Sequence, residues 1–459
     1  MENNKTATHA DSVTATQPEA ESTALRTGAF PAVEAHPPNK QRWKTAVSLA
    51  AAGAMLSACG GLGGGVYNGP FGVHEASHLL RRAAALGNIN DANHLAALGL
   101  EKAVDHLLDQ PHLPEEHDPD YFDDNDIDYV HEWANHWLAS RTPAAERLTL
   151  FWHGHFVTEA GKVGEHMSYL KINKLRELSL GSFRDLLYMI AEDPAMIRYL
   201  DNNTSTKEHP NENWARELME LFTLGEGHYT EKDIQEIARA FTGWTAYYDD
   251  GIYYFTFEGR DHDFEPKQIL GHTVHNRYTP IAEGYDVLDI LLGMDQTYKY
   301  ISQKLLRYYY RPNPDRGMID RGANILKDGT VRDFLKWLFT HPDFYADETR
   351  NALVKSPFEY AVGLYYAAGK RKVAEGESLH YYLRSRLDQD PYNPPNVAGW
   401  PIASTEWLTD STLLQRLKYI HVATTFPDGA SPEEPADYSV FMDGAANPLS
   451  LVAPEAQLL

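Results

Sequence analysis

Apolar residues recur at the three- and four-residue spacing of an α-helix through most of the chain between residues 74 and 425. Residues 245–258 differ, because β-favouring residues there flank an Asp-Gly pair, which is typical of a hairpin turn. The pattern predicts a mainly α fold, with a large multi-helix domain and a small inserted β-hairpin. Besides two helices between 74 and 108, we expect helices over 143–156, 168–180, 182–192, 193–200, 211–225, 230–241, 281–293, 297–310, 316–326, 329–340, 348–368, 375–386 and 409–425.

Composition divides the chain into five parts. Residues 1–36 are rich in Thr, Ala, Glu and Ser, a composition typical of disordered segments. Residues 37–58 have the pattern of a signal peptide, and the glycine-rich residues 59–69 predict a flexible tether. The helical domain is expected over 70–425, and an acidic, Pro-rich and loosely ordered tail over 426–459.

The single cysteine, Cys59, ends a segment that resembles a bacterial lipoprotein signal peptide. Three basic residues between 40 and 44 precede an apolar run over 45–55, and a Leu-Ser-Ala-Cys box follows it. The resemblance implies export, cleavage before Cys59 and a lipid on its sulfur that attaches the protein to a membrane. The two glycines after Cys59 favour the outer membrane. The apolar run is too short for a membrane-spanning helix, and a buried Ala-rich segment is the alternative.

Charge and missing motifs exclude several classes of function. The formal net charge of -24 at pH 7 argues against nucleic acid and against electrostatic docking on anionic lipid. The sequence contains no phosphate-binding loop with its Lys-Ser/Thr pair, no Gly-x-Ser-x-Gly elbow, no His-Glu-x-x-His and no cysteine metal cluster. Nucleotide hydrolysis, serine hydrolysis and zincin proteolysis are therefore disfavoured.

Residues 211–225 place a carboxylate next to the apolar face of a helix. At about 100° per residue, the apolar side chains cluster around Trp214, and Glu217 lies on the flank of that cluster, whereas Glu220 points to solvent. A carboxylate on this flank must be paired, hydrogen bonded, metal bound or protonated. Glu217 is therefore a candidate catalytic acid or base, or a metal ligand.

Two histidines, His153 and His155, end the helix expected over 143–156. On a helix they point about 200° apart, which disfavours a shared metal. His155 shares a face with Phe151 and Trp152, whereas His153 points away from that face. His155 is therefore the better candidate for a buried imidazole that acts as a base or ligand, and a core histidine hydrogen bonded to a backbone carbonyl or a carboxylate is the alternative.

The simplest joint explanation of His155 and Glu217 is that their helices meet with these two groups in contact. Such a pair is suited to be a general base with its orienting partner, part of a divalent-metal shell, or a link between two helices. The charged loop 261–267 adds His262 and Asp263 as further metal-ligand candidates, unless the loop is only a solvated surface.

Four further residues are candidates for substrate binding. Asn211 opens the Glu217 helix and either caps it or helps its free N–H groups to hold an anion. Arg216 is suited to bind a substrate or to pair with Glu220. Lys267 ends the charged loop, and Trp400 offers an aromatic platform for a glycan or closes the core.

Several long motifs resemble, in their order, the bacterial family catalogued as domain of unknown function 1800. The resemblance spans about residues 70–420. Its motifs are His78–Ala83, Leu150–Phe156, Asp193–Met196, Asn211–Gly225, Ala240–Trp244, His262 with Asp263, Lys267 with 270–271, Lys355–Pro357 and Pro394–Pro401. The resemblance implies an exported bacterial protein, with an exported alkaline-phosphatase-like protein as a partner, and it implies no particular reaction.

Two classes of function fit these features. The first is a hydrolase or metal-assisted enzyme that acts on an envelope or extracellular polymer, with Glu217 and His155 as its acid/base or ligand groups. The second is a non-catalytic protein of the cell surface, which either assembles with another exported protein or binds glycans.

Overall fold

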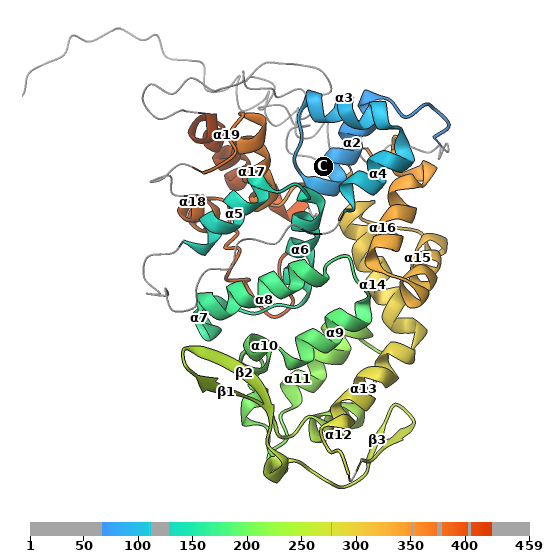
Figure 1. Cartoon of the computed structure of the whole chain (residues 1–459), viewed down its shortest axis with the longest axis vertical. Coiled ribbons are helices and arrows are strands. Elements are labelled where there is room, and N and C mark those ends of the chain that lie inside the picture. The colour runs from blue at the N-terminus through green and yellow to red at the C-terminus, as the bar shows by residue number, and fades with distance from the viewer. Residues whose placement is uncertain are drawn as a thin grey trace, which may run out of the picture. The chain divides into compact units, whose positions relative to one another are not determined.

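The computed structural model describes residues 67–109, 111, 128–276, 278–350, 352–373, 379–402 and 405–424 (Figure 1). These residues are mainly α-helical, with two small antiparallel hairpins, so the predicted fold class is confirmed. The predicted segments 1–36 and 37–58, Cys59, most of 59–69 and the tail 426–459 lie outside the described residues. None of the described helices has the length and apolar character needed to cross a membrane.

The N-terminal helical region contains three helices where the sequence predicted two. They are α2 (Val73–Ala84), α3 (Ile89–Leu98) and α4 (Leu100–Leu107). Asn88 begins α3 by accepting hydrogen bonds from the backbone N–H groups of Asn90 and Asp91. Gly99 adopts a φ of +79° and separates α3 from α4, which explains why the apolar pattern around it did not form one continuous helix.

Helix α6 (Pro143–His155) is buried between two hydrophobic clusters. Pro143 occupies its first turn, as the sequence predicted, and the chain leaves the helix at Phe156. Leu148 and Trp152 belong to one cluster, whereas Leu150 belongs to the other, which is formed with α5 (Tyr129–Ala139), a helix that was not predicted. A helix enclosed in this way presents almost no solvent face, and its polar residues must find partners inside the protein.

The middle of the chain follows the predicted boundaries closely, except that the short helix α7 was not predicted. Its helices are α7 (Ala160–Val163), α8 (Glu165–Leu178), α9 (Phe183–Glu192), α10 (Pro194–Tyr199), α11 (Glu212–Glu217) and α12 (Glu231–Ala240). Thr230 and Asp233 form the predicted capping box at the start of α12. Between α11 and the loop to α12, residues Leu218–Thr223 form a π-helix.

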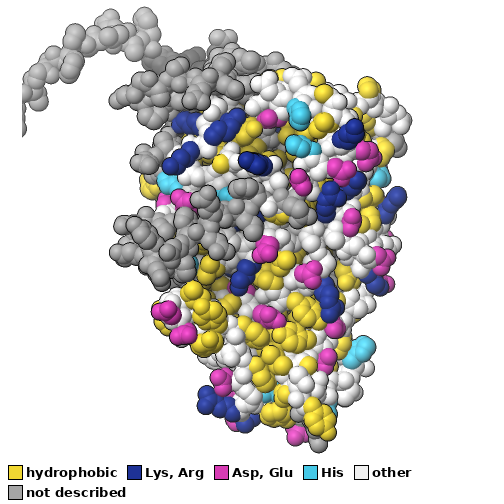
Figure 2. Space-filling model, viewed as in Figure 1, with side chains coloured by type: hydrophobic (Ala, Val, Ile, Leu, Met, Phe, Trp, Pro, Cys, Tyr) yellow, Lys and Arg dark blue, Asp and Glu magenta, His cyan; other side chains and the backbone are white. Residues whose placement is uncertain are grey.

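The predicted β-hairpin is confirmed. Strands β1 (Trp244–Asp249) and β2 (Ile252–Phe257) pair antiparallel around Asp250 and Gly251, both of which have positive φ. A second, shorter hairpin, β3 (Lys267–Ile269) and β4 (His272–Val274), was not predicted. Figure 2 shows hydrophobic side chains, with acidic ones beside them, over the first hairpin at the left edge of the view.

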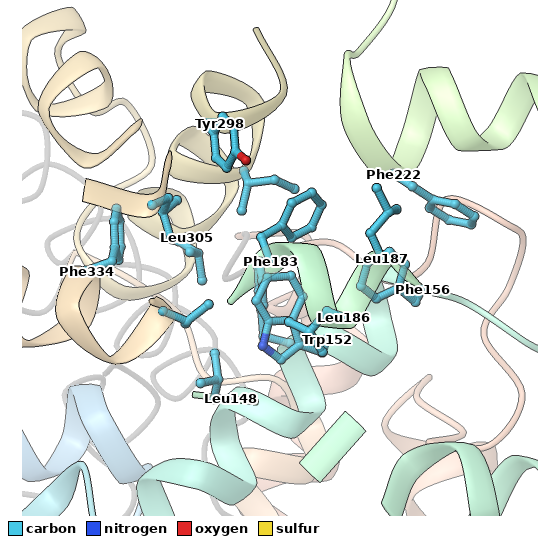
Figure 3. Packing of buried hydrophobic residues seen from close by; sticks show 14 of the residues in the cluster. Leu148, Trp152, Phe156, Phe183, Leu186, Leu187, Phe222, Tyr298, Leu305 and Phe334 are labelled. Carbon is cyan, nitrogen blue, oxygen red and sulfur yellow. The ribbon is translucent and has the colours of Figure 1, made fainter. Parts of the chain in front are cut away.

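The C-terminal half is helical as predicted, with one clear error. The helices are α13 (Ala282–Gly293), α14 (Asp295–Tyr309), α15 (Arg316–Asp328), α16 (Val331–Thr340), α17 (Pro357–Ala367), α18 (Leu379–Arg386) and α19 (Asp410–Thr424). The helix expected over 348–368 begins only at Pro357, because Ser356 caps it and proline is tolerated only in the first turn. In the larger cluster, α6, α9 and α14 pack together through residues such as Trp152, Phe183 and Leu305 (Figure 3).

Candidate functional site

Two sequence motifs that lie far apart in the chain touch at the end of α6. Gly399 has a φ of +81°, and a Cβ atom on it would overlap the carbonyl oxygen of Gly154. The neighbouring Trp400 ring lies 5.6 Å from the ring of His153, measured between centroids. Glycine at position 399 is therefore required both by the backbone angle and by the close approach of the two backbones.

A small cavity of about 40 Å³ lies beside this contact. That volume holds a few water molecules or a small chemical group, and no polymer repeat. The residues around the cavity come from α6, α14, the start of α17 and the segments 389–402 and 405–407: Leu150, Phe151, Gly154, His155, Lys304, Tyr308, Ser356, Glu359, Gln389, Trp400, Pro401, Ile402 and Trp407.

His155 is buried and both of its ring nitrogens are engaged. Nε2 lies 3.2 Å from the backbone oxygen of Phe222, and Nδ1 lies 2.8 Å from Nζ of Lys304. A carbonyl can only accept, so Nε2 carries the hydrogen and Nδ1 accepts a hydrogen bond from the lysine. Burial and the neighbouring Lys304 hold the pKa of His155 well below its usual range, and the imidazole is neutral at pH 7.

Lys304 projects from α14 toward the cavity and is partly exposed. Among the described residues, no carboxylate lies within ion-pair distance of its Nζ, which stands 5.3 Å from the centroid of the Tyr300 ring. Burial, and to a smaller extent Arg307, lower the pKa of Lys304 to about 7. A large fraction of this amine is therefore neutral at physiological pH, as a general base or a nucleophile requires.

Glu359, which lines the cavity, forms a buried ion pair with Arg147 of α6. Arg147 donates from Nε to Oε1 of Glu359 over 2.7 Å, and Tyr308 donates its hydroxyl to the same oxygen over 2.9 Å. The other oxygen, Oε2, accepts from the backbone N–H of Ser356 over 2.7 Å. Burial opposes ionisation of Glu359, but these partners, led by Arg147, hold its pKa below the usual value. The carboxylate of Glu359 therefore has a structural role.

The expected contact between His155 and Glu217 is wrong, because Lys304 and Phe222 occupy both nitrogens of His155. Glu217 is partly buried, and no described residue forms a hydrogen bond or an ion pair with its carboxylate. Burial, followed by the charge of Glu220, raises its pKa. Glu217 also contributes to the raised pKa of Tyr199, after burial and Glu159, which places it on the side of α11 that faces α10.

A π-helix follows Glu217. The backbone N–H of Leu224 reaches the carbonyl of Met219, five residues back, over 2.8 Å, and the side-chain hydroxyl of Thr223 donates to the carbonyl of Leu218 over 2.6 Å. The wider backbone turn adds a residue, so a projection at 100° per residue fails for the residues after Glu217. The carbonyl of Phe222, at the end of the π-helix, becomes the group that His155 contacts.

The candidate ligands of the charged loop have partners of their own. His262 and Lys267 are buried and both contact the carboxylate of Glu283 on α13. Asp263 forms two hydrogen bonds with Arg239, of 2.7 and 3.2 Å. These contacts fasten the loop to α12 and α13, and Lys267 is inaccessible to a substrate.

The proposed metal set of His155, Glu217, His262 and Asp263 is therefore not assembled. In the described part of the chain, no group of three or more His, Cys, Asp or Glu side chains is arranged to hold a metal ion. The four candidates do not converge: His155 contacts Lys304, Asp263 contacts Arg239, His262 contacts Glu283, and the charge of Glu220 acts on Glu217.

The other substrate-binding candidates have mixed outcomes. Asn211 caps α11, since its side-chain oxygen accepts from the N–H of Asn213 over 2.7 Å. Arg216 forms two hydrogen bonds of 3.0 Å with the exposed Glu231 rather than with Glu220, whose carboxylate accepts from Tyr229. Trp400 lines the cavity and packs against His153 instead of standing on an open groove.

Sequence reasoning missed Lys304 and Glu359. Lys304 lies beside the apolar stripe of its predicted helix, where lysines usually extend their amines to solvent, so the sequence carries no signal for its burial. For Glu359 the sequence does carry a signal, because Ser356-Pro357-Phe358-Glu359 is a capping box. Recognition of this box would have predicted the start of α17 and the position of the Glu359 carboxylate beside it.

Comparison with known proteins gives a family and nothing finer. No curated protein and no solved structure matches the chain. A family model described as a protein of unknown function, DUF1800, matches residues 78–452, which is most of the sequence. The paired motifs at Gly154 and Gly399, together with the residues around the cavity, all lie within this match. The chain belongs to the DUF1800 family.

Proposed function

We propose that the protein is an exported, lipid-anchored acid–base enzyme of the cell envelope, with Lys304 as its reactive group. The observation that carries this proposal is the hydrogen bond between Nζ of Lys304 and Nδ1 of His155 at the wall of a small cavity. The lipoprotein-like segment before Cys59 supports the location. Glu217, which lies away from the cavity lining, remains a less favoured candidate.

The proposed chemistry is proton abstraction by the neutral amine of Lys304. One N–H of the amine points to His155, which fixes its direction and leaves its lone pair available to the cavity. A water molecule there transfers a proton to the lone pair as it attacks the substrate, and the resulting ammonium returns the proton to the leaving group. Because the cavity admits only a small group, a polymeric substrate would present a terminal or pendant group to it.

A non-catalytic role is the second candidate, and one observation favours it. The hydrogen bonds from Lys304 to His155 and from His155 to Phe222 connect α14, α6 and the π-helix, as a purely structural link would. In that case the protein is a surface component that works with an exported partner.

The pKa of Lys304 tests the enzymatic candidate, which requires a neutral amine. In protein with 13C-labelled lysine, we expect the Cε resonance of Lys304 to titrate at about pH 7, because burial disfavours its ammonium form. The unfolded chain then binds more protons than the folded chain between about pH 7 and 10.5, so stability rises with pH in this window. Lys171, with a pKa also lowered to about 7 by burial, contributes to the same rise.

The variant Lys304→Met identifies the Cε resonance of Lys304, because that resonance disappears from its spectrum. The variant should also show a smaller rise in stability with pH than the wild type. Lys299→Met is the matched control, since it removes an exposed lysine of the same helix that pairs with Asp320 over 3.4 Å. A titration of Lys304 only above about pH 9 would contradict the enzymatic proposal and leave the structural role.

The proposed anchor has a separate test. The variant Cys59→Ser is expected to shift the protein from the membrane fraction to the soluble fraction, because the serine hydroxyl is not a substrate for the lipid transfer. Membrane and soluble fractions are compared by immunoblotting. Unchanged fractionation of Cys59→Ser would count against lipid attachment.

A further inference from the structure

The hairpin β1–β2 exposes an aromatic pair that the cavity does not use. Tyr247 and Tyr254 face each other across the two strands, with ring centroids 5.6 Å apart and planes inclined by 31°. The two side chains are 49% and 43% exposed. The two rings contact each other, and no other ring, hydrogen-bond or ion-pair partner of either side chain is found in the described part of the chain.

The opposite face of the hairpin packs against the helices. There Trp244 is buried and packs on Phe255 and on Tyr285 of α13, with ring centroids 5.0 Å apart in both cases. Nearer the turn, the guanidinium of Arg198 lies 4.4 Å from the centroid of the Tyr253 ring. Around Trp244 this face fixes the hairpin to the helices, and Tyr248 nearer the turn is exposed. The other face holds Tyr247 and Tyr254 out to solvent.

We propose that the face of the hairpin formed by Tyr247 and Tyr254 binds a neutral glycan chain. The C–H faces of a sugar ring stack on aromatic rings, and the tyrosine hydroxyls and the adjacent Asp249 carboxylate offer partners for sugar hydroxyls. The platform is two rings wide, which suits one or two sugar units.

Other occupants fit the charges and dimensions less well. The exposed carboxylates of Asp249 and Asp250 at the turn, together with the net charge of -24, repel anionic polymers and anionic lipid headgroups. A protein interface commonly covers about 800 Å² on each partner, far more than two tyrosine rings provide. The glycan proposal is independent of Lys304, because the hairpin contributes no residue to the cavity.

Sedimentation of the purified full chain with insoluble polysaccharides tests the proposal, with cellulose and curdlan as neutral probes and insoluble polygalacturonate as the anionic one. We expect binding to a neutral probe, weakened about tenfold or more in Tyr247→Ala/Tyr254→Ala because both stacking rings are lost. Tyr278→Ala is the matched control, since Tyr278 is 99% exposed and outside the hairpin.

Three outcomes would overturn the glycan site: no binding of the wild type to either neutral probe, equal binding by the double variant, or preference for polygalacturonate. Circular dichroism establishes that the double variant is folded. The variant Lys304→Met is expected to bind as the wild type does, so a failure of this proposal is distinguishable from a failure of the proposed chemistry.

Discussion

The variant Arg147→Met is expected to lower the free energy of unfolding by about 3–5 kcal/mol, because it leaves the buried carboxylate of Glu359 without its cation. Arg147 also donates to the backbone oxygens of Arg82 and Tyr308, and its guanidinium lies 4.3 Å from the centroid of the Tyr308 ring. Urea unfolding followed by circular dichroism measures the loss. A decrease below about 1 kcal/mol would contradict the importance of this ion pair.

The loss should depend on pH in a defined direction. Arg147 and its neighbours hold the pKa of Glu359 below the usual value, so this carboxylate stabilises the fold above the pKa of an unfolded glutamate. The contribution disappears as the pH falls through the folded pKa. The difference between wild type and Arg147→Met should therefore be largest near neutral pH and shrink under acid conditions.

Two further variants identify the cause. Arg147→Met/Glu359→Gln removes both charges, and its loss should be smaller than the sum of the two single losses, because neither partner remains as an unpaired buried charge. Arg216→Met removes an arginine whose partner Glu231 is exposed, and it should change stability little. If the double variant lost as much stability as the two single variants together, Arg147 and Glu359 would stabilise the fold independently of each other.

Much of the fold could be predicted from local sequence patterns. The capping box at Thr230, the proline at 143 and the Asp250-Gly251 turn all stand where the sequence placed them, because each depends on residues within one turn of the backbone. The helix expected over 348–368 begins only at Pro357, because proline is tolerated only in the first turn of a helix. The sequence did not predict the boundary between α3 and α4, which the positive φ of Gly99 creates.

The candidate site was predicted only in part. The burial of His155 followed from its place on α6, and its hydrogen bond to a backbone carbonyl was among the alternatives. Its second partner, Lys304, lies 149 residues away and has no local sign of burial. The expected contact with Glu217 is wrong because His155 meets the carbonyl of Phe222 and the amine of Lys304 instead. Phe222 lies in a π-helix, which a regular helical projection does not predict.

The contact between Gly154 and Gly399 leads to the second large effect. The variant Gly399→Ala is expected to lower the free energy of unfolding by roughly 2–4 kcal/mol, because the added methyl group combines an unfavourable positive φ with overlap of the Gly154 carbonyl. Relief of the overlap requires the chain at 399 to move away from α6, and Trp400 moves with it. Urea unfolding measures the cost.

Gly227→Ala is the matched control, because Gly227 has a φ of +83° and no atom within 4 Å of an added Cβ. The decrease in the free energy of unfolding of Gly227→Ala should come from the backbone angle alone, and it should be smaller than that of Gly399→Ala. In Gly399→Ala, displacement of Trp400 should also open the cavity to water, which solvates the ammonium of Lys304 and raises its pKa from about 7 toward that of an ordinary lysine. If the two alanine variants lose the same stability and the Lys304 titration is unchanged, the loop does not control the environment of the amine.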